Sequence, residues 1–248
     1  MKVTVVTAVW NAAETISDAL ESVLTQDHPD IELLVMDGGS TDGTQDRVGA
    51  FQDPRLRMVS EPDKGIYDAL NKGLAAATGD IIGFVHADDM LAGPAVLSTI
   101  LRAFEETGCD LTYGDLDYVS AADTVRIIRH WQAGDYSRGK LSRGWMPPHP
   151  TVYARRALYE RIGPYNTSYR IAADYDAILR MFSADDVRAT YIPETLVKMR
   201  MGGVSNRNFT EIRRKSREDL RAVRENGVGG AATIAAKNLR KLPQFFLR

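Results

Sequence analysis

The first part of the chain alternates between short apolar runs and segments in which apolar residues recur every three or four positions. The runs predict strands at 3–9, 31–37, 55–60 and 81–85. The periodic segments predict helices at 16–24, at 66–77 and after Pro94. Runs that are apolar at nearly every position are typical of strands buried on both faces of a parallel sheet. The alternation therefore predicts an α/β fold in which a mostly parallel sheet is flanked by helices.

The pattern loosens after Thr107, where short strand-like pieces alternate with irregular segments. A stretch rich in Gly, Pro and Trp at 134–150 predicts a long loop. The sequence contains no internal repeat and no low-complexity segment. A polar, helix-like stretch begins near residue 206, so we expect one domain at 1–205 and a basic helical extension at 206–248.

The composition narrows the class of protein. The 248 residues are 44% hydrophobic and 26% charged, which is ordinary for a globular protein in water. The single cysteine, Cys109, excludes an internal disulfide and a cysteine-based zinc cluster, and it favours a reducing compartment. The first residues predict a strand rather than a signal peptide, and no apolar stretch reaches the roughly 20 residues of a membrane-spanning helix. We therefore expect a cytoplasmic protein.

The charge is unevenly distributed along the chain. Residues 211–248 hold ten Lys or Arg against four Asp or Glu, a local charge of +6, whereas the formal charge of the whole chain is -2. Basic residues beside Phe245 and Phe246 are typical of a segment that binds anionic lipid headgroups, which predicts a peripheral contact with the inner face of the plasma membrane. A solvated helical face, packing against the body of the protein, and contact with a second copy in a homodimer are the alternatives. No nucleic acid partner is expected.

Polar residues follow each of the four predicted strands. They are Thr7 and Asn11 at the first strand, Asp37 at the second, Glu61 and Asp63 at the third, and Asp88 and Asp89 at the fourth. A single residue of this kind is a turn residue or a helix cap. Four strands that deliver acids or amides to one edge are harder to explain in this way, because ligands of open α/β sheets bind at the carboxyl ends of the strands.

A cation at this edge explains the collection of carboxylates, because a buried charge costs several kcal/mol unless it is paired or bound to a metal. Oxygen ligands favour Mg²⁺ or Mn²⁺, and Mg²⁺ commonly combines one or two carboxylates with substrate phosphates. The ligand expected from this chemistry is a diphosphate. The sequence after the first strand, WNAAET, lacks the G-x-G-x-x-G of dinucleotide-binding folds, and no G-x-x-x-x-G-K-[ST] phosphate loop is present.

Four segments resemble, in order and spacing, those of the family 2 glycosyltransferases, which have the Rossmann-like GT-A fold. The segments are VTAVWNAAETISDALESVLTQ, IELLVMDGGSTDGT, EPDKGIYDALNKGLAAATGDIIGFVHADD and IAADYDAILR, and the resemblance covers residues 2–205. It implies transfer of a sugar from a nucleotide-diphosphate donor to a hydroxyl acceptor, with inversion at the anomeric carbon. The resemblance is closest to small bacterial enzymes that build exopolysaccharide, lipopolysaccharide or glycolipid.

Two other functions remain open at this point. A sugar nucleotidyltransferase has a similar sheet, but it would have a glycine-rich loop with Arg or Lys after the first strand, and WNAAET has neither. A non-catalytic nucleotide-sugar-binding scaffold would bind the donor without a catalytic base.

The resemblance also implies which residues contact the donor. Thr7, Val9 and Asn11 are implied to border the nucleotide, and Asp37 is implied to accept a hydrogen bond from its base or ribose. The remaining implied donor contacts are Asp63, Lys64, Asn71, His86, Asp88, Arg200 and Ser205. The last two lie in a segment that we expect to close over the diphosphate.

His86, Ala87 and Asp88 stand where the family has its D-x-D motif, so histidine replaces the first acid. Residues i and i+2 of an extended segment point the same way, and this spacing delivers two ligands to one site. The resemblance implies that Asp88 coordinates Mn²⁺ or Mg²⁺. Asp89 is implied to be a further metal ligand, with an outer-shell position or a cap for the helix after Pro94 as alternatives.

An inverting transfer needs a base that takes the proton of the acceptor hydroxyl. Resemblance to the acidic motif that opens a helix in this family selects Asp174, and a simple helix N-cap is the alternative for this residue. Trp145 is a candidate to stack on an acceptor sugar, and His149 to contact the acceptor or the donor phosphate. Core packing and a structural hydrogen bond are the respective alternatives. A membrane-bound tail favours a lipid-linked saccharide or a glycolipid as the acceptor.

Overall fold

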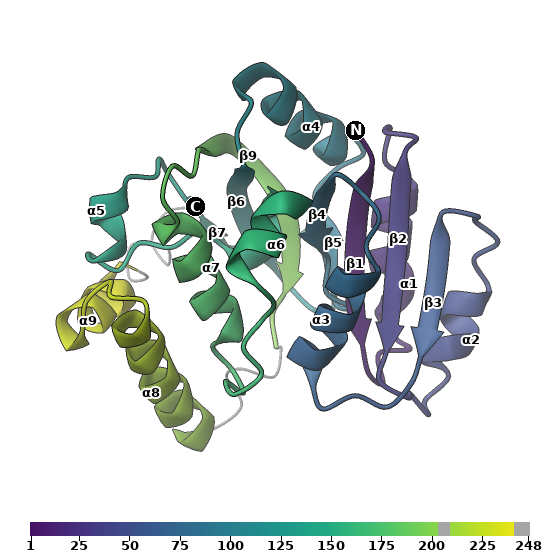
Figure 1. Cartoon of the computed structure of the whole chain (residues 1–248). Coiled ribbons are helices and arrows are strands. Elements are labelled where there is room, and N and C mark those ends of the chain that lie inside the picture. Colours follow the sequence, from purple (N-terminus) through teal and green to yellow (C-terminus); the bar gives the residue numbers. More distant parts are fainter. Residues whose placement is uncertain (203–208, 241–248) are drawn as a thin grey trace.

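The computed structural model describes residues 1–202 and 209–240, which form a layered α/β structure (Figure 1). Its strands are β1 (Val3–Val9), β2 (Ile31–Asp37), β3 (Leu56–Ser60), β4 (Ile81–Phe84), β5 (Asp89–Leu91), β6 (Leu111–Val119), β7 (Ile127–Trp131), β8 (Tyr153–Arg155) and β9 (Ala189–Arg200). Its helices are α1 (Ile16–Leu24), α2 (Thr44–Gly49), α3 (Ile66–Ala76), α4 (Val96–Thr107), α5 (Arg138–Leu141), α6 (Arg156–Ile162), α7 (Ala173–Ser183), α8 (Phe209–Glu225) and α9 (Ala231–Leu239), with a short 3-10 helix η1 (His149–Thr151). The α/β class and the strands and helices expected in the first part of the chain are confirmed.

The strands form one curled sheet in the order β3-β2-β1-β4-β8-β6-β9-β5, and β7 pairs with β6. The pairs β1–β2, β2–β3, β1–β4 and β6–β9 are parallel, whereas β5, β7 and β8 are antiparallel to their neighbours. In the parallel register Val9 pairs with Asp37, and Asp37 pairs with Ser60. The carboxyl ends of the first three strands therefore lie side by side, at the lower edge in Figure 1.

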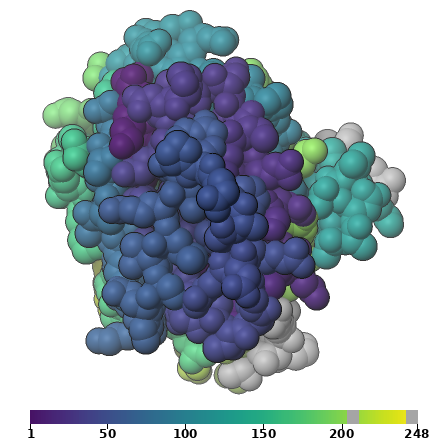
Figure 2. All heavy atoms as spheres, turned by 90° about the vertical axis from the view of Figure 1, so that its right-hand side faces the viewer, coloured from purple at the N-terminus to yellow at the C-terminus, as the bar shows by residue number. Residues whose placement is uncertain are grey.

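Both faces of the sheet are buried, as its apolar strands require. Val5 of β1 packs in one core with Leu20 of α1, whereas the next residue, Val6, packs in a second core with Leu70 of α3. This alternation is the expected consequence of successive strand residues pointing to opposite faces. Seen from the side of β3, the purple and blue spheres of the N-terminal part of the chain form most of the surface (Figure 2).

The structure differs from the sequence-based expectation at three places. Asp89 opens β5, which pairs with β9, so it does not cap α4, whose N-cap is Ala95. Asn11, for which a helix cap was one of the two simple explanations, does not cap α1, because the N-cap of that helix is Thr15. The segment expected to be a long loop at 134–150 contains α5 and the start of η1.

The helix α8 packs against α7 at one side of the molecule, and α9 packs against α8 and contacts Tyr175 of α7 through Lys237 (Figure 1). Val223 of α8 and Ile234 of α9 belong to the same hydrophobic core as Phe182 of α7. Gly144, with a φ of +76°, allows a further close approach, because a Cβ at this position would lie 2.2 Å from the backbone nitrogen of Lys237. The described part of the extension is therefore docked on the body of the protein. None of the helices in the described ranges is long and apolar enough to span a membrane.

Candidate active site

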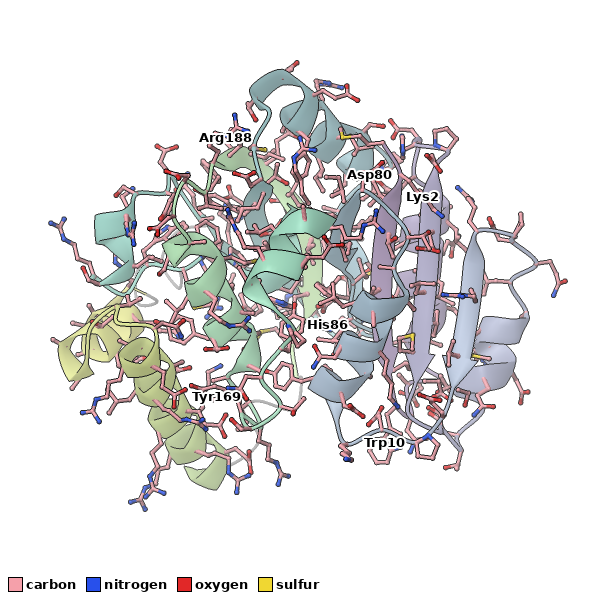
Figure 3. All side chains as sticks on the ribbon, viewed as in Figure 1. Lys2, Trp10, Asp80, His86, Tyr169 and Arg188 are labelled. Atoms are coloured by element: carbon pink, nitrogen blue, oxygen red, sulfur yellow. The ribbon has the colours of Figure 1, made fainter. Side chains whose placement is uncertain are left out.

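The candidate site lies where the parallel strands end. Figure 3 shows Trp10, which follows β1, at the end toward which the arrows of β1, β2 and β3 point, and Lys2 at the opposite end. The strand β4 ends at Phe84, and His86 follows two residues later. The polar residues that follow these strands in the sequence therefore come from neighbouring strand ends.

The Asp37 carboxylate is the centre of a buried hydrogen-bond network. It accepts from the Ser40 hydroxyl at 2.5 Å, from the Ser60 hydroxyl at 2.6 Å and from the Gln45 side-chain amide at 2.9 Å. Burial alone would raise the pKa of the Asp37 carboxyl, but these hydrogen bonds, led by that from Ser40, lower it below the usual value. Asp37 thus fixes the loop that follows β2, and its oxygens already have partners inside the protein.

Asn11 ties the loop after β1 to the loop after β2. Its backbone is left-handed, with a φ of 50°, and its side-chain oxygen accepts from the Thr41 backbone N–H at 2.9 Å. The Asn11 backbone N–H donates to the Ser40 hydroxyl at 2.8 Å. The Gly38 N–H donates to the Val9 carbonyl oxygen at 2.9 Å, which joins the two loops a second time. Together the loops form one continuous rim at the carboxyl edge.

The other residues implied for the nucleotide side occupy varied positions. Thr7 is 1% exposed inside β1, and its hydroxyl has no hydrogen-bond partner among the described residues. Asp63 accepts from the Gly65 N–H at 2.7 Å. Lys64 is exposed at the surface. Asn71 exchanges two hydrogen bonds with the backbone of Tyr165, at 2.8 and 2.9 Å, so its side chain joins α3 to the segment before α7.

The segment after β4 presents two adjacent carboxyl groups in different environments. Asp88 is half-buried, whereas Asp89 is 1% exposed. Within the described part of the chain, neither oxygen of Asp89 has a hydrogen-bond partner. Burial, and secondarily the charge of Asp88, raises the pKa of the Asp89 carboxyl well above its usual value. Asp88 is thus the more accessible acid and the one that a ligand reaches more easily.

Arg200 holds the backbone of this acidic segment. Its Nη1 donates to the Asp88 carbonyl oxygen at 3.1 Å, and its Nη2 pairs with the Asp18 carboxylate of α1. Arg200 is the last residue of β9 rather than part of a loop, and its side chain is 9% exposed. The other residue expected to close over the diphosphate, Ser205, lies outside the described residues.

Asp174 lies in the first turn of α7. The N-cap of this helix is Ala172, so the alternative that Asp174 is a simple N-cap is wrong. The Tyr67 hydroxyl of α3 shares its proton between Asp174 Oδ1, at 3.2 Å, and the Ile171 carbonyl oxygen, at 2.6 Å. Burial, and then the charge of Asp174, raises the pKa of Tyr67 well above its usual value, so the hydroxyl stays protonated and acts as a donor.

A series of rings joins the acidic segment to Asp174. His149 stacks on His86, with ring centroids 6.0 Å apart. The Nε2 atom of His149 lies 2.8 Å from the Tyr165 hydroxyl, and the Tyr165 ring stacks on Tyr67 with centroids 5.9 Å apart. In Figure 3, His86 lies in the middle of the molecule, beside α3. The series therefore connects the end of β4 with the hydroxyl that donates to Asp174.

The two histidines are neutral at neutral pH. Burial lowers the pKa of His86, and the charges of Asp88 and Asp174 oppose this shift. Both carboxylates are thus within electrostatic reach of the same imidazole. Burial also lowers the pKa of His149, to about 4, and again the charge of Asp174 opposes the shift. The charge of Asp174 therefore acts on both buried histidines, although it lies far from them in the sequence.

A divalent cation fits the residues of this segment. Among the described residues, no group of three or more His, Cys, Asp and Glu side chains is arranged to hold a metal. Mg²⁺ and Mn²⁺ sites that bind substrate phosphates need fewer protein ligands, because water and the phosphates complete the coordination shell. Asp88 offers an accessible carboxylate, and both Asp89 oxygens and His86 Nδ1 are buried polar atoms without a partner in the described ranges. This donor set suits a hard cation that is shared with a phosphate ligand.

Trp145 belongs to the core and not to the site. It is 5% exposed, and its Nε1 donates to the Ala133 carbonyl oxygen at 2.7 Å. Its ring packs on Tyr113, Tyr136 and Phe182. The expectation that Trp145 stacks on an acceptor sugar is therefore wrong, because its neighbours bury the ring.

His149 makes the structural hydrogen bond that was the alternative to a ligand contact. It is 8% exposed, and its partner is the Tyr165 hydroxyl. Burial of the imidazole leaves little of its surface for an acceptor or a phosphate. His149 instead belongs to the ring series that supports the site.

Three residues at the site were not singled out from the sequence. Trp10 is 69% exposed beside the rim, and its place between a buried strand and Asn11 was the available signal. Tyr67 and Tyr165 gave no signal, because only the folded chain brings them to Asp174.

Comparison with known proteins gives a family match. The family model described as "Glycosyl transferase family 2" matches residues 4–163. A "PGL/p-HBAD biosynthesis glycosyltransferase" of Mycobacterium bovis (strain BCG / Pasteur 1173P2) is 33% identical over 201 residues, which cover 79% of this chain and 76% of the relative. A protein of the same name from Mycobacterium tuberculosis (strain ATCC 25177 / H37Ra) matches equally well.

Solved structures match the fold over almost the whole chain. S. aureus TarS 1–349 in complex with UDP has a TM-score of 0.67 and 19% identity, with 99% of this chain and 71% of that chain covered. A mannosyltransferase from Pyrobaculum calidifontis in complex with GDP-Man and Mn²⁺ has a TM-score of 0.66 and 22% identity, with 99% and 73% covered. The chain spans 43% of the longer TarS chain. These likenesses confirm the expected GT-A fold.

Proposed function

Because the chain belongs to glycosyl transferase family 2 and is a glycosyltransferase, we propose that it moves a sugar from a nucleoside-diphosphate donor to a hydroxyl acceptor, with inversion and with the help of a divalent metal. One observation carries this proposal. His86, two residues before Asp88, is joined to Asp174 of α7 by the stacked rings of His149, Tyr165 and Tyr67 and by the hydrogen bond from the Tyr67 hydroxyl. Two carboxylates on either side of one connected set of rings can serve two different tasks, one at the leaving group and one at the nucleophile.

The donor nucleotide is proposed to bind on the rim at the ends of β1, β2 and β3. The exposed Trp10 indole offers a flat apolar face for the base. Asp37 and Asn11 hold the shape of the rim, and Val9 contributes through its backbone. Lys64 is exposed nearby and offsets phosphate charge. UDP in TarS 1–349 and GDP-Man in the Pyrobaculum enzyme support a nucleotide ligand of this class, although those proteins establish only the fold here.

Asp88 is proposed to hold Mn²⁺ or Mg²⁺ together with the donor diphosphate, with Asp89 behind it. Arg200 keeps the Asp88 backbone in place, and the side chain of Asp88 is left for the ligand. When bound, such a metal neutralises the charge that develops on the departing nucleoside diphosphate. The chain's own contribution is to present the half-buried Asp88 carboxylate at the carboxyl edge of the sheet, with the backbone of that residue held by Arg200. Mn²⁺ in the Pyrobaculum neighbour is consistent with a metal of this kind.

Asp174 is proposed to act as the catalytic base. It takes the proton of the acceptor hydroxyl while the acceptor oxygen bonds to the anomeric carbon and the bond from that carbon to the diphosphate oxygen breaks. Attack from the side opposite the leaving group gives inversion. Tyr67 binds one carboxylate oxygen of Asp174 and so orients the other oxygen toward the acceptor.

A glycolipid or a lipid-linked saccharide is the acceptor class that we propose. The mycobacterial relatives are named "PGL/p-HBAD biosynthesis glycosyltransferase". Basic residues lie along one face of α8. Exposed arginines occur there at nearly every turn, at positions 213, 217, 221 and 224. Such a face fits an anionic membrane surface and therefore a peripheral position at the inner face of the plasma membrane. The aromatic residues of the expected membrane-binding tail, at 241–248, lie outside the described residues.

In this proposal residues 1–205 carry the transfer chemistry, and residues 206–248 form an extension. The family match favours transfer over the two alternatives, a sugar nucleotidyltransferase and a silent scaffold. A transfer assay with UDP-, GDP- and dTDP-sugars, octyl glycosides as acceptors and Mn²⁺ tests the proposal. Proton NMR of the product should show the anomeric configuration opposite to that of the donor. Product of retained configuration, or equal turnover by Asp174→Asn, would contradict it.

A further inference from the structure

Glu218 of α8 binds the backbone that leads into α7. Its Oε2 accepts from the N–H of Ile171 at 2.8 Å and from the N–H of Ala172 at 3.0 Å. Its Oε1 accepts from the N–H of Arg170 at 3.2 Å. One carboxylate from the C-terminal extension therefore takes three consecutive amides of the main domain.

Those three amides stand directly before the proposed base. Ala172 is the N-cap of α7, and Asp174 follows two residues later. The Ile171 carbonyl oxygen, on the same short segment, accepts from the Tyr67 hydroxyl, which also donates to Asp174 Oδ1. Glu218 of α8 and Tyr67 of α3 thus both form hydrogen bonds with segment 170–172. The position of Asp174, which follows this segment, therefore depends on both residues.

The start of α7 favours a carboxylate at this position. The first N–H groups of a helix have no partner within the helix, and a Ser, Thr, Asp or Asn at the N-cap usually satisfies one of them. Ala172 cannot do this, and α7 has no side-chain cap hydrogen bond. A carboxylate near a helix N-terminus also interacts favourably with the helix dipole, and hydrogen bonds to a charged acceptor are stronger than neutral ones. Glu218 accepts from the N-cap amide of Ala172 and from the two amides before it, whereas Asp174 Oδ1 accepts from the Tyr175 N–H inside the helix.

Further contacts of α8 keep Glu218 at this place. Asn226 donates to Asp176 Oδ1 of α7 at 2.9 Å. Glu225 accepts from the Tyr169 hydroxyl at 2.7 Å. In Figure 3, Tyr169 lies between α7 and α8, next to the segment that Glu218 holds. These hydrogen bonds hold α8 to residues on both sides of segment 170–172. Glu218 is the residue of α8 that binds the backbone amides of the segment itself.

We propose that Glu218 is a positioning residue for the transfer reaction: it fixes segment 170–172 and thereby holds the Asp174 carboxylate where the acceptor hydroxyl is deprotonated. The inference rests on the proposed role of Asp174 as the base. It makes the C-terminal extension part of the catalytic unit, because the extension completes the geometry of a residue in the main domain. Displacing α8 would then slow the chemical step without affecting the distant nucleotide rim.

A positioning role and a simple stabilising role differ in their kinetic consequences. A misplaced base lowers kcat and leaves donor binding intact, whereas general loosening of the fold affects stability and both kinetic constants. A displacement of the order of 1 Å is enough to cost about 100-fold in rate. The ratio of the effects on kcat and on donor binding therefore separates the two.

The experiment compares Glu218→Gln with a control variant of equal charge. The control is Glu105→Gln, at an exposed residue of α4, in place of a change at Glu225, whose contact with Tyr169 helps to hold α8. Glu105→Gln also removes one negative charge, but only Glu218 touches the amides before α7. Turnover is followed as release of nucleoside diphosphate from UDP-N-acetylglucosamine or GDP-mannose with octyl glycosides, and donor binding is measured by calorimetry with Mn²⁺. Glu218→Gln should lower kcat about 10- to 100-fold and leave the donor dissociation constant within about 2-fold, whereas Glu105→Gln stays near wild type in both.

Wild-type kcat in Glu218→Gln, or equal losses in the two variants, would overturn the inference. If circular dichroism shows that Glu218→Gln is unfolded, Glu218→Asp replaces it. Its carboxylate is shorter by one methylene, so a smaller but clear loss of kcat is expected, and wild-type kcat would again count against the proposal. Asp174→Asn is measured in parallel. If Asp174→Asn has wild-type turnover, the assignment of Asp174 as the base is wrong. If Asp174→Asn is impaired but the Glu218 variants have wild-type turnover, only the positioning role of Glu218 is wrong.

Discussion

The Tyr67 hydroxyl lies 3.2 Å from Asp174 Oδ1, although the two residues are 107 positions apart in the sequence. Its other acceptor is the Ile171 carbonyl oxygen, at 2.6 Å. Burial, and then the charge of Asp174, keeps the pKa of this phenol well above its usual value, so it donates over the whole physiological pH range. The relationship leaves one oxygen of Asp174 for the acceptor and fixes its direction.

Replacing Tyr67 with Phe should therefore impair the chemical step. We expect Tyr67→Phe to lower kcat about 10-fold, because Asp174 Oδ1 keeps the Tyr175 N–H but loses its side-chain donor, and to cost about 1 kcal/mol of stability through the lost hydrogen bonds. Steady-state kinetics and urea unfolding measure the two effects. Donor binding should be unchanged. An unaltered kcat would show that Tyr67 does not orient Asp174.

Replacing Trp10 should instead impair donor binding. The indole is 69% exposed, so Trp10→Ala is expected to change the free energy of unfolding by less than about 0.5 kcal/mol. Loss of stacking on the base should weaken the nucleoside diphosphate by about 1–3 kcal/mol, and Trp10→Phe should recover part of it. Calorimetric titration with UDP and GDP measures the difference. Equal affinities in wild type and Trp10→Ala would exclude stacking at this position.

The parts of the fold that could be predicted depend on local patterns. The apolar run of β1 and the helical spacing of α1 appear in the sequence, because burial imposes period and composition on single elements. Asp88 and Asp174 could be proposed because they stand in motifs that resemble a family. The short β5 was missed, because its existence depends on pairing with β9 more than a hundred residues later.

Tertiary contacts explain why the roles of Trp145 and Glu218 could not be predicted from the sequence. Trp145 stands in a loop-like segment, and only the rings that pack on it show that it belongs to the core. Glu218 stands in a helix that looks solvated, since its partners are backbone amides that no sequence pattern displays. A polar residue of this kind cannot be assigned from spacing alone. The role of Glu218 depends on the distant segment whose backbone N–H groups it binds.

Burial of His149 should make the protein acid-sensitive. Its pKa falls from 6.5 to about 4 on folding, so below pH 6.5 the unfolded chain binds a proton that the folded chain excludes. The free energy of unfolding is therefore highest above pH 6.5, where His149 is neutral in both states, and it decreases as the pH falls from 6.5 toward 4. Between about pH 7 and about pH 5 the expected loss is about 2 kcal/mol.

Urea unfolding of wild type and His149→Gln at these two pH values tests the expectation. Glutamine retains a partner for Tyr165 but does not titrate, so the variant should lose less stability on acidification. Burial also lowers the pKa of His86, which acts in the same direction, and the dependence should shrink without disappearing. His28→Gln, a partly exposed site, is the matched control. An unchanged pH dependence in His149→Gln would contradict the account.

Removing only one partner of the buried ion pair between Lys237 and Asp219 should lower the free energy of unfolding strongly. Their side chains are 4% and 6% exposed, the Lys237 Nζ lies 2.9 Å from Asp219 Oδ2, and it also lies 3.2 Å from the centre of the Tyr175 ring. Lys237→Met leaves a buried carboxylate without its cation, which should cost about 3–5 kcal/mol. The double variant Lys237→Met with Asp219→Leu should recover most of this loss. Urea unfolding measures all three proteins, and a single variant as stable as wild type would contradict the expectation.

The most direct test of the account is a calorimetric titration of UDP- and GDP-sugars with and without Mn²⁺, in wild type, Asp88→Ala and Asp174→Asn. Asp123→Ala, an exposed acid in the turn between β6 and β7, controls for the change in charge. We expect one donor to bind wild type, Asp174→Asn and Asp123→Ala in a metal-dependent way, and to lose that dependence in Asp88→Ala. A donor affinity that is the same with and without Mn²⁺ and in Asp88→Ala would contradict the assignment of Asp88 to the metal and diphosphate. Absence of binding by every donor tested would contradict it as well.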